Sequence, residues 1–139
     1  MILLDSSYLI AFHNSRDVHH QAAADVMSDL LRGRWGQVLL PEYVFLEVTT
    51  VIAARRGVAK AAEVGRVLLQ AREVEFVPCS DLFLDAFTIF AERGEAGLSF
   101  VDAALIAAAR RRGAKCIASF DRDFEAFVSH GLRWEELGT

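Results

Sequence analysis

Two kinds of segment alternate along the chain: short apolar runs, and longer stretches in which apolar residues recur at helical spacing. The short runs predict buried strands at residues 2–4, 37–40, 74–77 and 115–118. The longer stretches predict helices at residues 17–31, 42–56, 59–72, 80–94, 99–112 and 121–128. Strands separated by helices of this length are typical of parallel crossover units, so we expect an α/β fold.

This order of elements predicts a three-layer, doubly wound sheet of four to five mostly parallel strands flanked by helices. No linker, low-complexity tract or internal repeat interrupts the pattern, so we expect a single domain over residues 1–139. Ligands of such sheets bind outside the carboxyl ends of the strands, where the strand order reverses. The first strand ends at Asp5 and the fourth leads into Asp121 and Asp123. We therefore expect the chemistry between these two strands.

The composition narrows the class of protein. With 53% hydrophobic and 24% charged residues, the chain is too apolar for an intrinsically disordered protein. The longest apolar run, Ala103 to Ala109, is far shorter than the roughly 20 residues that cross a bilayer. The amino terminus does not resemble a secretory signal, and the spacing of Cys79 and Cys116 matches no metal or redox motif. We expect a reduced, cytoplasmic protein without a membrane partner.

The net charge does not exclude a nucleic-acid substrate. Fifteen Lys and Arg against nineteen Asp and Glu give −4, which is unlike most nucleic-acid binders. If four of the acids surround a metal ion, however, the remaining acids equal the bases in number. The charge of the rest of the surface would then be balanced.

Glu47 is the most informative acidic residue of the sequence. It lies in the segment YVFLEVTTVIA, which is apolar nearly all round, and none of its helical neighbours is basic. A carboxylate is costly to bury in such surroundings. Glu47 therefore lies either on a narrow solvated stripe or in a buried metal or acid–base site.

The other candidate acids each have a structural interpretation beside the functional one. Asp102 lies in SFVD, which matches a helix capping box, and a capping carboxylate can still direct one oxygen outward. Asp5 precedes Ser6 and Ser7 and could cap a short helix. In SFDRDF, the acids at 121 and 123 could serve as an N-cap and a first-turn residue.

Considered together, these acids point to a metal ion. Two carboxylates about 5 Å apart repel each other by roughly 3 kcal/mol at an effective dielectric constant of about 20. Several such groups do not remain ionised together without a cation. Oxygen ligands favour Mg²⁺ or Mn²⁺ over zinc, which prefers His and Cys.

Four short motifs, in order and covering nearly the whole chain, resemble those of PIN-domain ribonucleases, the small single-domain family that includes VapC-type toxins. The motifs are ILLDSS, PEYVFLEV, LSFVDAALIAAARRRGA and IASFDRDF. The resemblance assigns an acidic quartet to Asp5, Glu47, Asp102 and Asp121, with Asp123 as an accessory metal ligand and with Ser6 and Ser119 as flanking polar residues. Ser119 stands where the family commonly has Thr, and it keeps the hydroxyl group.

The resemblance implies an Mg²⁺-dependent endoribonuclease, with Mn²⁺ as a substitute, that cuts single-stranded or loop RNA. Asp5, Glu47 and Asp102 would hold the metal, and Asp121 would complete its shell or position the attacking water. The apolar residues of helix 42–56 span more than one buried face, so we expect part of this surface to contact a second subunit. The resemblance points to a homodimer and to a small antitoxin protein as partner. Toxin and housekeeping RNA-processing enzyme both remain open interpretations.

Other classes of protein fit less well. A phospho-accepting receiver domain needs an Asp at the end of its third strand, where this chain has Val77-Pro78-Cys79. A haloacid-dehalogenase phosphatase needs a second Asp two residues after the first, where this chain has Ser7. The remaining alternative is a PIN-fold RNA- or protein-binding module without catalysis. His13, Asn14 and Arg16 are weaker candidates for the rim of a site, and the scattered arginines, among them Arg55, for a rim that binds the RNA backbone. The pair His19-His20 suggests a metal site, but adjacent residues of a helix do not share a face, so we expect these two at an exposed helix start.

Overall fold

The computed structural model describes residues 1–93, 97–121 and 133–134. Its strands are β1 (Ile2–Leu4), β2 (Val38–Pro41), β3 (Val74–Val77), β4 (Cys116–Ala118) and β5 (Arg133–Trp134). Its helices are α1 (Ser6–Phe12), α2 (His20–Leu31), α3 (Glu42–Arg56), α4 (Val58–Gln70), α5 (Cys79–Arg93) and α6 (Phe100–Arg112). The expected helix at residues 121–128 lies outside the described residues, except for Asp121.

The described strands form one parallel sheet in the order β3–β2–β1–β4–β5. The strand order therefore reverses between β1 and β4, which are direct neighbours with Leu3 opposite Ile117. This arrangement confirms the predicted doubly wound fold and its point of reversal. The carboxyl ends of β1 and β4 meet there, so the residues that follow these two strands lie close together.

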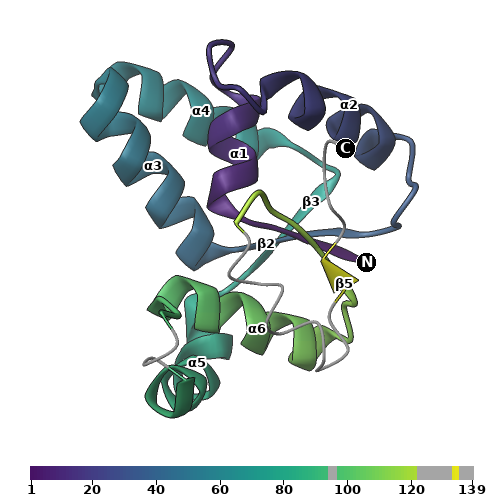
Figure 1. The fold of residues 1–139 in the computed structure, drawn as a ribbon, viewed down its shortest axis with the longest axis vertical. Helices are drawn as coiled ribbons and strands as arrows, with labels where there is room; N and C mark the ends of the chain where they lie inside the picture. The colour runs from purple at the N-terminus through teal and green to yellow at the C-terminus, as the bar shows by residue number, and fades with distance from the viewer. Residues whose placement is uncertain (94–96, 122–132, 135–139) are drawn as a thin grey trace.

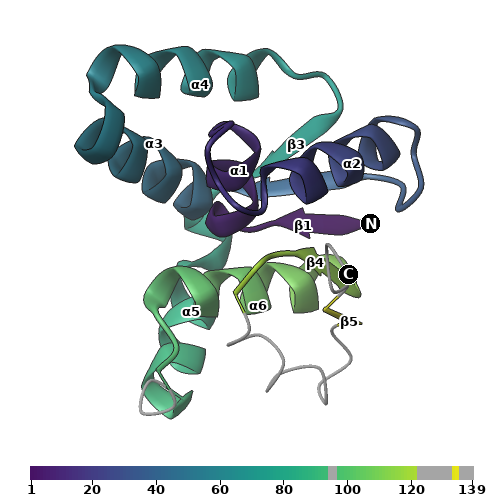
Figure 2. The same cartoon turned by 45° about the horizontal axis from the view of Figure 1, so that its top comes forward.

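Helices cover both faces of the sheet and make the three layers that the sequence predicts. Figure 2 shows α1 to α4 above the sheet and α5 and α6 below it. The apolar run from Ala103 to Ala109 is buried throughout because α6 lies between the sheet and α5. None of the described helices combines the length and the apolarity that crossing a membrane requires.

One predicted helix boundary is wrong. We expected the helix of residues 17–31 to begin with Asp17 as its N-cap, but α2 begins at His20. The Asp17 carboxylate instead accepts a hydrogen bond from the backbone N–H of His19, at 2.8 Å, and this closes a tight turn before the helix. Asp residues form such turns readily, because the side chain reaches the backbone two residues further on. The turn brings His19 to the start of α2.

Candidate active site

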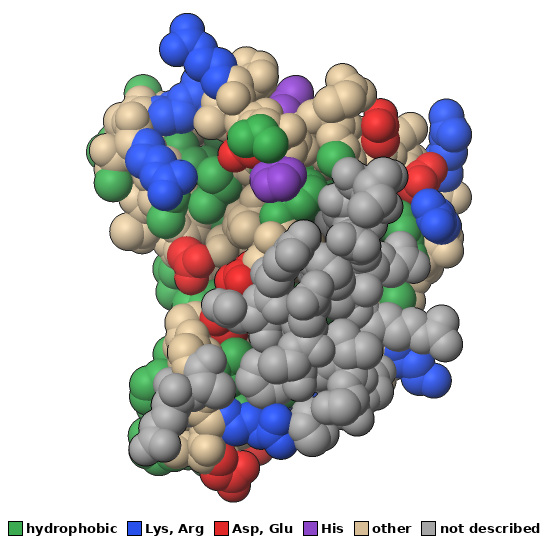
Figure 3. Space-filling model, viewed as in Figure 1, with side chains coloured by type: hydrophobic (Ala, Val, Ile, Leu, Met, Phe, Trp, Pro, Cys, Tyr) green, Lys and Arg blue, Asp and Glu red, His purple; other side chains and the backbone are tan. Residues whose placement is uncertain are grey.

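An open cleft of about 580 Å³ lies at the point where the strand order reverses. The four acidic residues of the predicted quartet all line it. Asp5 follows β1 and Asp121 follows β4, whereas Glu47 comes from α3 and Asp102 from α6. The fold thus brings together four carboxylates that are far apart in the sequence. Figure 3 shows acidic side chains near the middle of this face of the molecule.

Asp5 is the most deeply buried of the four, with 3% of its surface exposed. Its Oδ2 atom accepts hydrogen bonds from the hydroxyl groups of Ser7, at 2.8 Å, and Ser119, at 2.6 Å. Burial raises the pKa of Asp5 above its ordinary value, the hydrogen bonds from Ser119 and Ser7 lower it, and the charge of Glu47 raises it. Asp5 occupies the N-cap position of α1, yet its side chain makes no capping hydrogen bond. Capping therefore does not explain this carboxylate.

Asp102 combines the two roles that its motif allows. The capping box is present, because Ser99 Oγ accepts from the Asp102 backbone N–H and Asp102 Oδ2 accepts from the Ser99 backbone N–H, both at 3.1 Å. The same side chain lines the cleft. Burial raises the pKa of Asp102 to about 6; the hydrogen bonds with Ser99 oppose this shift, and the charges of Asp5 and Asp121 add to it.

The sequence placed Glu47 either on a solvated stripe or in a buried site. In the structure Glu47 is half-buried and lines the edge of the cleft. Ser6 Oγ donates a hydrogen bond to Glu47 Oε1 at 2.5 Å and links the start of α1 to the middle of α3. Val51, one helical turn beyond Glu47, also lines the cleft. The hydrogen bond from Ser6 holds one oxygen of this carboxylate in place beside Asp5.

Serine hydroxyl groups tie the loop after β4 to the start of α1. Ser119 is fully buried, and its Oγ atom accepts from the backbone N–H of Asp121 at 2.9 Å while it donates to Asp5. Ser7 Oγ accepts from the backbone N–H of Phe120 at 3.0 Å. Ser7 is therefore a site residue that we did not predict from the sequence, since only Ser6, of the two serines after Asp5, was assigned to the site. Asp123 lies outside the described residues.

The donor atoms of the cleft fit a hard divalent cation in their chemistry. All four acidic side chains offer carboxylate oxygens, which suit Mg²⁺ and Mn²⁺. The charges of Asp5 and Asp121 disfavour the ionised form of Asp102, the charge of Glu47 disfavours that of Asp5, and a cation would relieve this repulsion. The described residues nevertheless contain no ready-made group of three or more Asp, Glu, His or Cys side chains that could hold a metal ion. The side chains would have to approach one another around the ion.

The structure shows which of the weaker candidate residues line the cleft and which do not. His19, Phe120 and Arg55 line the cleft, whereas His13, Asn14 and Arg16 are not among its lining residues. Arginines near the end of α6 are engaged elsewhere. Arg111 donates to the carbonyl oxygen of Asp81, and Arg112 forms an ion pair with Glu75 at 2.6 Å.

A family model of the PIN domain matches residues 2–128, a span that contains every candidate site residue. The chain belongs to the PIN domain family. The resemblance of the four motifs to this family is thereby confirmed. No protein of curated function matches the sequence significantly.

Solved structures with the same fold include VapC-type proteins. VapC20 of Mycobacterium tuberculosis, a toxin that cleaves the sarcin–ricin loop, shares 26% sequence identity with this PIN domain. The match covers 91% of this chain and 95% of VapC20, with a TM-score of 0.81. VapBC2 of Rickettsia felis, solved with a DNA fragment from its promoter, matches at 13% identity and a TM-score of 0.70. That match covers 97% of this chain and 98% of the other, and it shows likeness of fold alone.

Proposed function

We propose that this PIN domain is a metal-dependent endoribonuclease that hydrolyses phosphodiester bonds in single-stranded or loop RNA, and that it acts as the toxin of a toxin–antitoxin pair. The observation that carries the proposal is the meeting of Asp5, Glu47, Asp102 and Asp121 in one cleft at the reversal of strand order. Membership of the PIN family and similarity to the toxin VapC20 support the reaction class.

Asp5, Glu47 and Asp102 would hold an Mg²⁺ ion, with Mn²⁺ able to replace it, and Asp121 and Asp123 would complete the site. The bound ion would supply positive charge that offsets the carboxylates and the charge developing on the phosphate oxygens, and it would make water more acidic. The protein side chains around the ion would hold and orient the water and the phosphate group.

The chain's own contribution is to hold the carboxylates in advance of the reaction. The hydrogen bonds from Ser7 and Ser119 fix Asp5, the bond from Ser6 fixes Glu47, and the capping box fixes Asp102. Once the ion has drawn the carboxylates together, groups held in this way need little further reorganisation when the substrate arrives. Asp121, which follows β4, would orient the attacking water and accept its proton as one phosphorus–oxygen ester bond breaks.

The proposed partners follow from the same comparisons. The substrate would be RNA, and because VapC20 cleaves the sarcin–ricin loop, an RNA hairpin with that loop is the first substrate to test. A toxin needs a small antitoxin protein to restrain it, and a short reading frame directly upstream would be its expected source. We expect the protein to act in the cytoplasm.

The metal requirement can be measured on such a hairpin. Cleavage should require Mg²⁺ or Mn²⁺, stop with EDTA and return when Mg²⁺ is added in excess. Glu47→Gln should lower the rate by about 100-fold or more, because it removes a charged ligand from the site. Glu63→Gln on the exposed face of α4 is the matched control and should cleave at the rate of the wild type. Cleavage that survives thorough chelation would refute the metal-dependent mechanism.

A further inference from the structure

The negative charge of this cleft opposes the binding of the proposed RNA substrate. Its described lining residues include five carboxylates, those of the acidic quartet and that of Asp17, but a single Lys or Arg side chain, that of Arg55. RNA carries one negative charge on each phosphate, and a divalent ion offsets only part of the acidic charge. An RNA strand that enters the cleft therefore needs attractive contacts beside the carboxylates.

Arg55 offers one such contact. Glu47, Val51 and Arg55 follow one another at intervals of four residues on the face of α3 that lines the cleft. At a rise of 1.5 Å per residue, Arg55 lies about 12 Å along the helix from Glu47. The two residues therefore lie at different points along the cleft.

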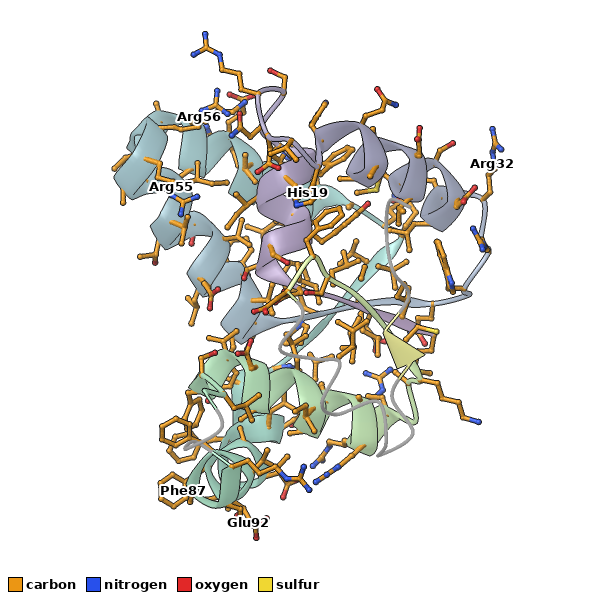
Figure 4. The ribbon with its side chains drawn as sticks, in the orientation of Figure 1. His19, Arg32, Arg55, Arg56, Phe87 and Glu92 are labelled. Carbon is orange, nitrogen blue, oxygen red and sulfur yellow. The ribbon has the colours of Figure 1, made fainter. Side chains whose placement is uncertain are left out.

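The guanidinium group of Arg55 is available to a ligand. The side chain is exposed and forms no ion pair or hydrogen bond with any described residue. Its neighbour Arg56 instead donates to the backbone carbonyl oxygen of His13 at 3.1 Å. Figure 4 shows Arg55 on α3 and His19 at the start of α2 on the same face of the molecule.

A stack of three aromatic rings runs from the core to the cleft wall, where Phe120 and His19 line the cleft. Tyr8 is buried in the core, and its hydroxyl group donates to the carbonyl oxygen of Ala23 at 2.9 Å. The ring of Phe120 stacks on Tyr8, with centroids 6.3 Å apart, and the ring of His19 stacks on Phe120 at 4.4 Å and an angle of 10°. The stack thus leads from the core to His19, which is exposed and lines the cleft.

The backbone around His19 is held in place by the turn before α2. The His19 N–H donates to Asp17 Oδ1, and the His20 N–H donates to the Asp17 carbonyl oxygen at 3.0 Å. A ring nitrogen of His20 lies 3.0 Å from the carbonyl oxygen of Ala11. This turn presents an exposed aromatic ring at the edge of an acidic cleft.

We propose that these residues form an RNA-binding subsite beside the carboxylates, in which a nucleobase stacks on the His19–Phe120 pair and Arg55 binds a backbone phosphate distant from the scissile bond. The proposal rests on the proposed ribonuclease function. Every base has an aromatic face that can stack, and a single arginine interacts with the charge of a phosphate whatever the base. The subsite therefore contributes affinity and positions the RNA with little sequence preference.

The test measures binding of a short, fluorescently labelled single-stranded RNA by anisotropy, with every variant made in an Asp102→Asn background to keep the RNA intact. His19→Ala should weaken binding about tenfold without changing its salt dependence, and His19→Phe should restore it. Arg55→Ala should weaken binding and lower the slope of log affinity against log salt by about 0.7, whereas Arg55→Lys should keep the slope.

Arg32→Ala is the matched control for Arg55→Ala, because it removes the same charge from an exposed position outside the cleft. It should leave both affinity and slope unchanged. Affinities of His19→Ala and Arg55→Ala equal to that of the background protein, together with cleavage of RNA by the wild type, would overturn the subsite and leave the ribonuclease standing. A wild-type protein that neither binds nor cleaves RNA would overturn both.

Discussion

At the scale of single residues, the burial of Asp5 and Asp102 is the feature that helix capping does not fully explain. Both are buried, and neither forms an ion pair with a described residue. Burial favours the neutral form of a carboxyl group, so each raises the free energy of the folded, ionised protein. The hydrogen bonds from Ser7, Ser119 and Ser99 offset part of this cost. A bound cation would offset the rest.

The raised pKa of Asp102 predicts a pH dependence of stability in the metal-free protein. Its pKa is about 6 in the folded chain against an ordinary value of 3.8. Between these values the folded state keeps a proton that the unfolded state has released, so the free energy of unfolding should fall as pH rises from 3.8 to about 6. Burial of Asp5 acts in the same direction.

Urea unfolding in EDTA at several pH values within this window measures the effect. The Asp102→Asn variant keeps an oxygen that can accept the hydrogen bond from Ser99 but does not titrate, so its stability should depend less on pH than that of the wild type. Identical pH profiles for the two proteins would contradict the raised pKa of Asp102.

At the same scale, the acidic residues could be predicted from the sequence, but the residues around them could not. Glu47 stood out because its helical neighbours are apolar, and Asp5 because it ends a strand. His19 and Arg55 gave no comparable signal, since which residues share the cleft depends on how α2 and α3 pack. Ser7 follows Ser6 in the sequence, and only the structure shows that it reaches both Asp5 and the backbone of Phe120.

At the scale of helices and strands, local signals predicted most of the elements. Helix α3 follows Pro41 and ends before Gly57, whose φ of 93° is readily adopted only by glycine. The capping box at Ser99 marks the start of α6 correctly. The two-residue strand β5 was not located from the sequence, because its pairing with β4 is a long-range contact. The start of α2 was misplaced because Asp residues stabilise turns as well as helix caps.

The sequence pattern did not show which apolar residues of α3 are exposed and which are covered by other helices. We expected the apolar residues of helix 42–56 to exceed what one buried face requires. Val44, Val48 and Ile52 are indeed buried in the core, and Leu46 is exposed. Pattern alone does not reveal that α4 covers a further part of this helix.

At the scale of the whole molecule, the exposed apolar surface of α5 is relevant to assembly. Exposed apolar side chains recur along this helix, and they are Phe83, Leu84, Phe87 and Phe90. Figure 4 shows Phe87 at the outer edge of the molecule. Contiguous exposed apolar residues commonly mark a protein–protein interface. Together with Leu46 on α3, they support the expectation of a homodimer.

Sedimentation at micromolar concentration tests this expectation. The wild type should sediment with twice the mass of one chain, and Phe87→Arg should shift the population toward the monomer, because it places a charge in the buried interface. Val18→Arg, at an exposed apolar position in the turn before α2, is the matched control and should leave the mass unchanged. A wild-type protein that sediments as a monomer would rule out the homodimer at that concentration.

The central claim of this account is that Asp5, Glu47, Asp102 and Asp121 act together as one metal-binding cluster. Thermal melting of the wild type and Asp5→Asn, with and without Mg²⁺, tests it most directly. The substitution removes the charge of a buried carboxylate that Glu47 repels and that disfavours the ionised form of Asp102, so the metal-free variant should melt higher than the wild type. Stabilisation by Mg²⁺ should shrink in the variant, and RNA cleavage should fall by orders of magnitude.

Glu63→Gln, at an exposed position on α4, is the control for the loss of one charge and should behave as the wild type in both measurements. The account predicts a higher melting temperature without metal, a smaller shift with Mg²⁺, and loss of cleavage for Asp5→Asn alone. An Asp5→Asn variant that melts below the wild type without metal, gains as much stability from Mg²⁺ and cleaves RNA at the same rate would contradict it.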